Sequence, residues 1–217
     1  MRTVVFDLDG TLADTSADLI AAANACFDAP MLDPVADAGT AFRGGRAMLK
    51  LGFERLGAPD VAAAVEAQYH PFLDRYADHI DVFTQLYPGT VAAVERLRAE
   101  GYATAICTNK PAGLAETLMA RLRVRDLFDA LVGADTLPVR KPDPAPYLAA
   151  VERAGGTLNR SMLIGDTVTD RDTARAAGVP CALVTFGPDG HGVADLQPEA
   201  LLDHYDGLFA LVDQMID

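Results

Sequence analysis

Short apolar runs alternate with helical patterns along most of this chain, and this alternation restricts the possible fold more than any other feature. From Pro88 onward, four helical stretches each lead into one apolar run of strand length. These runs read YATAICT, DALVGA, SMLIGD and PCALVTF, and a further run, TVVFDLDG, opens the chain. Strands that are apolar throughout and separated by helices form parallel sheets with both faces covered. The sequence therefore predicts an α/β fold built on a doubly wound parallel sheet.

The segment from residue 15 to residue 84 interrupts this alternation. It contains several helical patterns, and no strand lies between them. Residues 28–45 hold prolines and glycines, which favour loops or an interrupted helix. We therefore expect two domains, an α/β domain formed by residues 1–14 and 85–217 and a helical insertion formed by residues 15–84.

The composition argues against several classes of partner. The net charge is −13, and no basic cluster typical of nucleic-acid-binding proteins is present. No stretch reaches the roughly 18 apolar residues of a membrane span, and the N-terminus lacks the apolar run of a signal peptide. The three cysteines are widely spaced in apolar surroundings, which favours free thiols over disulfides or a zinc site. We expect a cytoplasmic protein, a monomer or homodimer, with no nucleic-acid or membrane partner.

Polar side chains lie where the predicted strands end. These residues are Asp7 and Asp9 after the first strand, Thr108 and Asn109 after the second, Lys141 after the third, and Asp166 after the fourth. Open α/β sheets bind ligands at the carboxyl ends of their strands. We therefore expect three carboxylates, a cation and a hydroxyl to meet at one edge of the sheet.

Three neighbouring carboxylates repel one another, and burial raises their pKa values, so a bound divalent cation is expected. Mg²⁺ prefers oxygen ligands and typically binds one or two carboxylates together with a substrate phosphate. Lys141 then offers a compact positive charge to a phosphate oxygen. Thr108 and Asn109 can donate hydrogen bonds to the same group. The pattern predicts a magnesium site beside a phosphate site.

Four segments occur in an order and spacing that resemble a known family: FDLDGTLADT, TNKP, RKPDPAPY and GDTVTDRDTARAAG. They are similar to motifs of the haloacid dehalogenase superfamily of hydrolases, in its phosphoglycolate phosphatase-like branch, and the resemblance covers nearly the whole chain. It implies a Rossmann-like core with a helical cap, residues 15–84, inserted after the first strand. It also implies a Mg²⁺-dependent phosphatase that acts on a small phosphorylated metabolite, phosphoglycolate or a similar compound, through an aspartyl-phosphate intermediate.

The resemblance implies a role for each matching residue. Asp7 resembles the nucleophile, and Asp9 resembles the general acid and base. Thr108 and Lys141 resemble phosphate-binding residues. The implied metal ligands are Asp7, the main-chain carbonyl of Asp9, and Asp166, with Asp170 as a further acid that acts directly or through water. The fourth motif departs from the common pattern at Thr167 and Thr169, but both of its acids remain.

The cap segment AFRGGRAM matches the family's glycine-containing specificity loop only loosely. Two interpretations of its arginines, Arg43 and Arg46, stay open: they bind the non-reacting end of the substrate, or they lie on a solvated surface. Glycines let a loop approach a site closely, and an arginine can hold a carboxylate by a forked contact.

Several alternatives share this fold. A dehalogenase would not need Asp9 or the metal-site acids, and a phosphonate hydrolase needs a cap lysine and a different residue two positions after the nucleophile. A non-catalytic binding protein predicts at least one broken motif, whereas all four motifs are intact here. A phosphosugar mutase keeps the same acids, so this alternative stays open beside the phosphatase.

Overall fold

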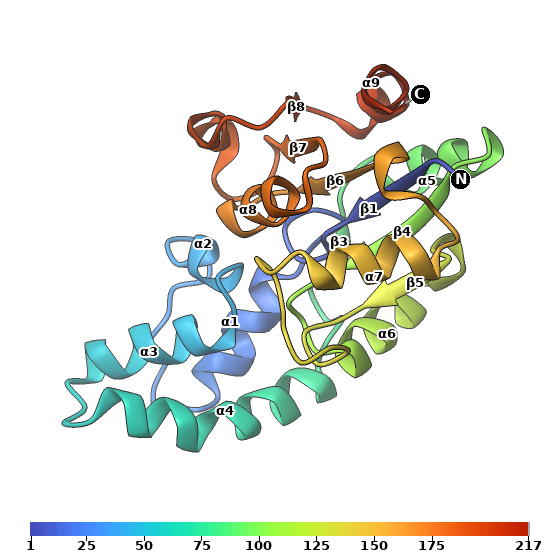
Figure 1. Cartoon of the computed structure of the whole chain (residues 1–217). Helices are drawn as coiled ribbons and strands as arrows, with labels where there is room; N and C mark the ends of the chain where they lie inside the picture. The colour runs from blue at the N-terminus through green and yellow to red at the C-terminus, as the bar shows by residue number, and fades with distance from the viewer. Residues whose placement is uncertain (217) are drawn as a thin grey trace. The chain divides into compact units, whose positions relative to one another are not determined.

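The computed structural model describes residues 1–216, which divide into two compact units (Figure 1). One unit consists of residues 1–13 together with the chain from Leu86 onward, and the other is Asp14–Gln85. Two short strands, β2 (Ala13–Asp14) and β3 (Gln85–Leu86), pair where the chain passes between the units. The roles of catalytic domain and cap for these units stay predictions.

The first unit contains a six-stranded sheet in the order β5-β4-β1-β6-β7-β8, and every neighbouring pair is parallel. The strands are β1 (Thr3–Phe6), β4 (Ala103–Cys107), β5 (Ala130–Val132), β6 (Ser161–Gly165), β7 (Cys181–Val184) and β8 (Ala200–Leu202). The chain builds outward from β1 through β4 to β5, then returns to the other side of β1 for β6, β7 and β8. The predicted doubly wound α/β fold is confirmed.

Helices cover both faces of this sheet. They are α5 (Thr90–Ala99), α6 (Ala112–Arg121), α7 (Ala145–Arg153), α8 (Val168–Ala177) and α9 (Leu208–Met215). Helices α7 and α8 pack together on one face, where Tyr147, Ala150 and Ala174 join the inward residues of the strands in a buried core. On the other face, α5 contacts β4, α9 contacts β8, and the two helices contact each other. Cys107 and Cys181 are buried in this unit as free thiols.

The sequence did not predict β8. This strand has three residues, and only Leu202 is buried, so it offers too short a pattern to recognise. After β8 the chain forms a short 3₁₀ turn, Tyr205–Gly207, before α9 starts at Leu208.

The second unit is helical. Its helices are α1 (Ser16–Asn24), α2 (Ala38–Ala41), α3 (Gly45–Leu56) and α4 (Val61–Asp78), and α1, α3 and α4 contact one another. Two glycines of α3 allow close packing, because a Cβ at Gly45 would lie 2.3 Å from the Phe72 ring and one at Gly52 would lie 2.2 Å from the Phe27 ring. The stretch expected to be irregular, residues 28–45, contains one short helix, α2.

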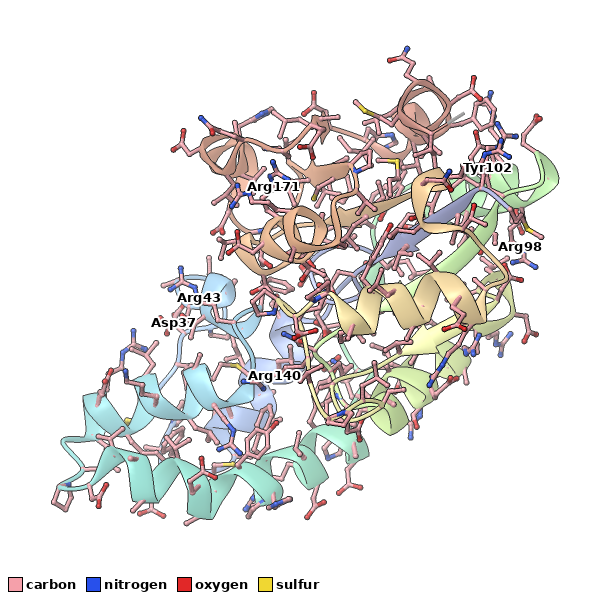
Figure 2. The ribbon with its side chains drawn as sticks, viewed as in Figure 1. Asp37, Arg43, Arg98, Tyr102, Arg140 and Arg171 are labelled. Atoms are coloured by element: carbon pink, nitrogen blue, oxygen red, sulfur yellow. The ribbon has the colours of Figure 1, made fainter. Side chains whose placement is uncertain are left out.

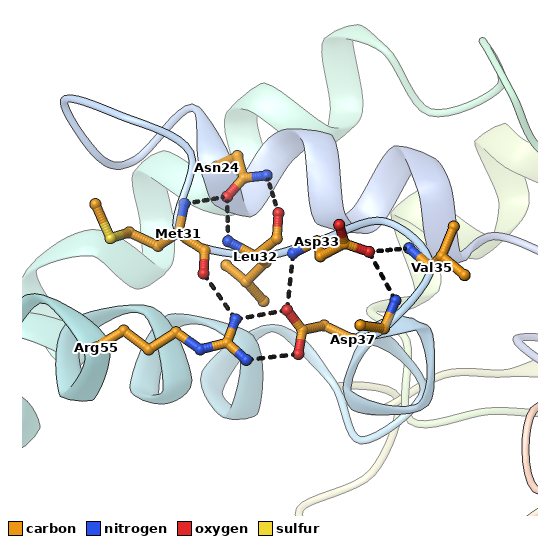
Figure 3. A network of polar contacts seen from close by, with 8 residues as sticks. Asn24, Met31, Leu32, Asp33, Val35, Asp37 and Arg55 are labelled. Carbon is orange, nitrogen blue, oxygen red and sulfur yellow. Dashed lines mark hydrogen bonds and ion pairs between the residues drawn. The ribbon is translucent and has the colours of Figure 1, made fainter.

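A network of polar contacts fixes the loop between α1 and α2 (Figure 3). The Asn24 side chain accepts hydrogen bonds from the backbone N–H groups of Met31 and Leu32 and donates one to the Leu32 carbonyl. From α3, Arg55 forms a two-pronged contact with Asp37 and also donates to the Met31 carbonyl. Asn24 therefore holds this loop to α1 through the loop backbone, and Arg55 holds it to α3 through the Met31 carbonyl and the Asp37 side chain.

Close packing of Gly156 against β1 gives a test of the α/β core. A Cβ at this position would lie 2.0 Å from Thr3 Oγ1. We expect Gly156→Ala to destabilise the protein by about 1–3 kcal/mol through overpacking, measured by urea denaturation. The control is Gly113→Ala in α6, where nothing lies within 4 Å of the new Cβ. This change should be stabilising by up to about 1 kcal/mol, because alanine favours a helix. Equal stabilities for both variants would contradict the packing.

Candidate active site

The strand ends bring separate parts of the chain to one edge of the sheet. Phe6 of β1 is in register with Ile106 of β4 and Ile164 of β6, so the residues that follow these three lie at the same level. The Asp7 N–H donates to the Ile164 carbonyl, and the Thr108 N–H donates to the Val132 carbonyl, both at 2.9 Å. The ladder of backbone hydrogen bonds therefore extends into the first residues of the site.

Lys141 comes from the loop before α7, and its ammonium lies between two carboxylates. Its Nζ is 2.9 Å from Asp7 Oδ1 and 2.6 Å from Asp170 Oδ1, and all three residues are buried. Burial alone would lower the pKa of Lys141, but attraction to Asp170 and Asp7 outweighs it and raises the pKa above its usual value. Lys141 therefore stays a cation at neutral pH.

The start of helix α8 places Asp170. Thr167 and Asp170 form a capping box, in which the Thr167 N–H donates to Asp170 Oδ2 and the Thr167 side chain accepts from the Asp170 N–H. The Thr167 hydroxyl also contacts Asp170 Oδ2 as a donor. This leaves Asp170 Oδ1 for Lys141. Gly165 makes the approach possible, because a Cβ there would lie 2.4 Å from Asp170 Cγ. Asp170 thus serves both the helix terminus and the site.

Asp166 follows β6 and is almost completely buried. Its Oδ1 accepts a hydrogen bond of 3.0 Å from the Thr11 hydroxyl. Within residues 1–216, no hydrogen-bond donor reaches its Oδ2. A buried carboxylate oxygen without a partner is costly, so this atom is available to an external ligand.

The three acids form a cluster that fits a divalent cation. One carboxylate oxygen from each of Asp7, Asp166 and Asp170 lies within 4.8 Å of the other two. When ionised, three carboxylates and the Lys141 ammonium leave two negative charges uncompensated. Burial raises the pKa of Asp7 to about 6, an effect opposed by Lys141 and increased by Asp170. Burial, Asp170 and Asp7 likewise hold the pKa of Asp166 well above its usual value. A divalent cation would offset this repulsion and would give Asp166 Oδ2 a partner by binding to it.

The second acid of the first motif, Asp9, has its own cation. Lys110 Nζ lies 2.7 Å from Asp9 Oδ1, with 4% of the lysine side chain and 17% of the aspartate side chain exposed. Sequence reasoning missed Lys110, although it stands inside the TNKP motif. A usable signal was the scarcity of lysine: the chain has three lysines, and two of them, Lys110 and Lys141, lie in this site.

The two other predicted phosphate-binding residues lie beside the carboxylates but make protein contacts here. The buried hydroxyl of Thr108 accepts a hydrogen bond from the Lys110 N–H at 3.1 Å. The Asn109 side chain donates to the main-chain carbonyl of Lys141 at 3.0 Å. Asn109 therefore ties the loop after β4 to the loop that carries Lys141, and phosphate binding by both residues stays a prediction.

The two arginines of the helical unit differ in their surroundings. Arg46, in α3, forms an ion pair with Glu66 and lies 3.8 Å over the centre of the Tyr69 ring, both in α4. Arg43 lies just after α2 and is exposed, and its guanidinium forms no hydrogen bond or ion pair within residues 1–216 (Figure 2). Arg46 therefore joins two helices, whereas the Arg43 guanidinium stays available to bind a ligand.

Comparison with known proteins agrees with this geometry. The family model of haloacid dehalogenase-like hydrolases matches residues 1–178, and the chain belongs to this family. A phosphoglycolate phosphatase of Mesorhizobium japonicum is 39% identical over 94% of this chain and 92% of its own length. A phosphoglycolate phosphatase of Caulobacter vibrioides is 38% identical over 93% of this chain and 88% of its own length. The predicted family and enzyme class, a phosphatase, are confirmed.

The fold has close counterparts among solved structures. A predicted phosphoglycolate phosphatase from Haemophilus somnus 129PT superposes with a TM-score of 0.86, at 22% identity, over 97% of each chain. At that identity, the likeness concerns the fold alone. Within residues 1–216, no helix is both long and apolar enough to cross a membrane.

The acidic cluster predicts a stability that depends on metal. We expect Asp166→Asn to raise the melting temperature of the metal-free protein, prepared with a chelator, by a few degrees. The pKa of Asp166 is higher in the folded protein than in the unfolded chain. At neutral pH, which lies above the pKa of an aspartate in the unfolded chain, this difference lowers the stability of the folded protein. The same change should abolish the stabilisation by Mg²⁺, about 2.7 kcal/mol at a hundredfold excess over Kd. Thermal unfolding with and without Mg²⁺ measures both effects.

Asp172→Asn is the matched control for this experiment. It removes one negative charge from α8, which starts two residues after Asp166, but the Asp172 side chain is 45% exposed and pairs with Arg175. This variant should keep the Mg²⁺-induced shift. An undiminished shift in the Asp166 variant would rule out Asp166 as a metal ligand.

Proposed function

We propose that this protein is a Mg²⁺-dependent phosphomonoester hydrolase that uses Asp7 as its nucleophile and acts on a small phosphorylated acid such as phosphoglycolate. The observation that carries the proposal is the buried Asp7 carboxylate, held by Lys141 at 2.9 Å within the acidic cluster. The two relatives named phosphoglycolate phosphatase support this class of substrate.

In the proposed reaction, the two acids of the first motif, Asp7 and Asp9, act one after the other. A carboxylate oxygen of Asp7 attacks phosphorus as the bond to the leaving oxygen breaks, which gives an aspartyl phosphate. Asp9 gives a proton to the leaving oxygen. It then takes a proton from the water that attacks the aspartyl phosphate, so Asp7 is restored and inorganic phosphate is released.

The remaining groups of the site stabilise charge. The Lys141 ammonium and the Thr108 hydroxyl would bind oxygens of the transferred phosphoryl group, where positioning and electrostatics supply most of the rate. Asp7, Asp166 and Asp170, with the main-chain carbonyl of Asp9, would hold the metal. When bound, the divalent cation supplies further positive charge to the phosphoryl oxygens.

The role of the nucleophile can be tested by changing one atom. Asp7→Asn keeps the size of the side chain but removes the nucleophilic oxygen, so phosphoglycolate turnover should fall by at least about 10³-fold while the fold is kept. Phosphate release with Mg²⁺ present measures turnover, and circular dichroism checks the fold. In the wild type, rapid acid quench and peptide mass spectrometry should find a phosphoryl group on Asp7. Turnover within tenfold of the wild type would exclude the mechanism.

The same assay separates the hydrolase from the mutase. A hydrolase transfers the phosphoryl group of Asp7 to water, so phosphate accumulates in step with substrate loss. A mutase returns it to a second hydroxyl, so an isomeric phosphosugar would accumulate with little phosphate. The latter result, on a phosphosugar panel, would replace the proposed reaction while keeping Asp7 as the nucleophile.

We also propose that Arg43 binds the carboxylate of the substrate, because its guanidinium is exposed and unpaired within the described residues. Arg43→Ala should lower kcat/KM on phosphoglycolate by about 10- to 100-fold, as expected for loss of a charged hydrogen bond, and leave p-nitrophenyl phosphate nearly unchanged. Arg46→Ala is the matched control, which should lower the melting temperature without changing substrate preference. Parallel losses on both substrates in the Arg43 variant would reject this role.

A further inference from the structure

Lys110 contacts Asp9, and the family motifs had not led us to expect this contact. The two carboxylates of the first motif each have a lysine from a different loop: Lys141 for Asp7 and Lys110 for Asp9. We infer that Lys110 is a positioning residue, which holds the Asp9 carboxylate in place for its proton transfers. This inference rests on the proposed function, in which Asp9 is the general acid and base.

The protein fixes Lys110 through its backbone. The Lys110 N–H donates to the Thr108 hydroxyl at 3.1 Å, and the Lys110 carbonyl accepts from the Ala134 N–H at 3.0 Å. Gly133 gives the room for this contact, because a Cβ there would lie 2.8 Å from the Lys110 carbonyl oxygen. The side chain therefore starts from an anchored backbone between the loops after β4 and β5 and reaches Asp9 with little freedom.

Electrostatics explain why Asp9 needs this contact. Asp7 and Asp9 stand two positions apart just after β1, and their carboxylates repel each other. Without a counter-charge, this repulsion would favour rotation of the Asp9 side chain away from Asp7, towards solvent. An ammonium at 2.7 Å opposes that rotation and keeps the carboxylate beside the nucleophile.

The choice of lysine is informative in this chain. Lysine and arginine together number 18, and three are lysines, so fifteen cations are arginines. Two of the three lysines are nevertheless the buried cations of the site. A lysine presents a compact point charge to one carboxylate oxygen, whereas arginine frequently takes both oxygens in a forked contact. A buried ion pair adds little net stability by itself, which favours a role in positioning over one in stability.

The test compares leaving groups. Lys110→Met keeps most of the side-chain volume but removes the charge. We expect its kcat/KM to fall about tenfold or more on an alkyl phosphate and less than about threefold on p-nitrophenyl phosphate, whose leaving group needs little protonation. The parameter kcat/KM is used because it reports the step in which the leaving group departs. Lys50→Met, at an exposed lysine of α3, is the matched control and should leave kcat/KM unchanged on both substrates.

A double-mutant cycle links the effect to Asp9. Asp9→Asn alone should show the same preference for the aryl ester, and adding Lys110→Met to it should change kcat/KM by less than about twofold, because both changes remove one function. The inference is wrong if Asp9→Asn shows the preference for the aryl ester but Lys110→Met lowers kcat/KM equally on both substrates. It is also wrong if the losses in kcat/KM of the two single variants multiply in the double variant. If Asp9→Asn itself shows no preference, the proposed role of Asp9 fails, and the inference fails with it.

Discussion

The site depends on one arrangement of buried charge, in which the Lys141 ammonium lies between Asp7 and Asp170. Asp166 stands beside them, and among residues 1–216 it forms no ion pair. Burial, together with repulsion between the carboxylates, raises the pKa values of Asp7 and Asp166, so this arrangement is costly in the metal-free protein. The same arrangement favours binding of a divalent cation and an anionic substrate together, since each compensates the other. Rigid neighbours sustain it: the capping box at the start of α8 and the Thr11 hydroxyl that binds Asp166.

Much of the fold follows from local sequence pattern. The strands TVVF and ATAIC are mostly apolar and polar residues follow them directly, so both their burial and the edge that carries the site could be predicted. Strand β8 could not, because Ala200 and Leu201 are not buried and three residues carry no clear period. Its place in the sheet is decided by pairing with β7.

The site was predictable at the level of residue type but not of pairing. The strand ends predicted that Asp7, Asp9, Lys141 and Asp166 meet at one edge, and the family resemblance added Asp170 as a further acid. Asp7, Asp166 and Asp170 lie together in one cluster. No pattern in the sequence revealed that Lys110 reaches Asp9, because the contact joins loops about a hundred positions apart. The contrast between Arg43 and Arg46 was equally hidden, since it depends on Glu66 and Tyr69 of another helix.

The central position of β1 has a consequence for synthesis of the chain. Strand β1 is synthesised before both of its neighbours in the sheet, β4, which ends at Cys107, and β6, which ends at Gly165. A nascent chain that stops before Ser161 therefore has β1 paired on one side at most, with Asp7 made but Asp166 and Asp170 still missing. The helical unit Asp14–Gln85 is contiguous and can form its own core during this interval. The charged site is thus completed late, after most of the apolar surface around it has been synthesised.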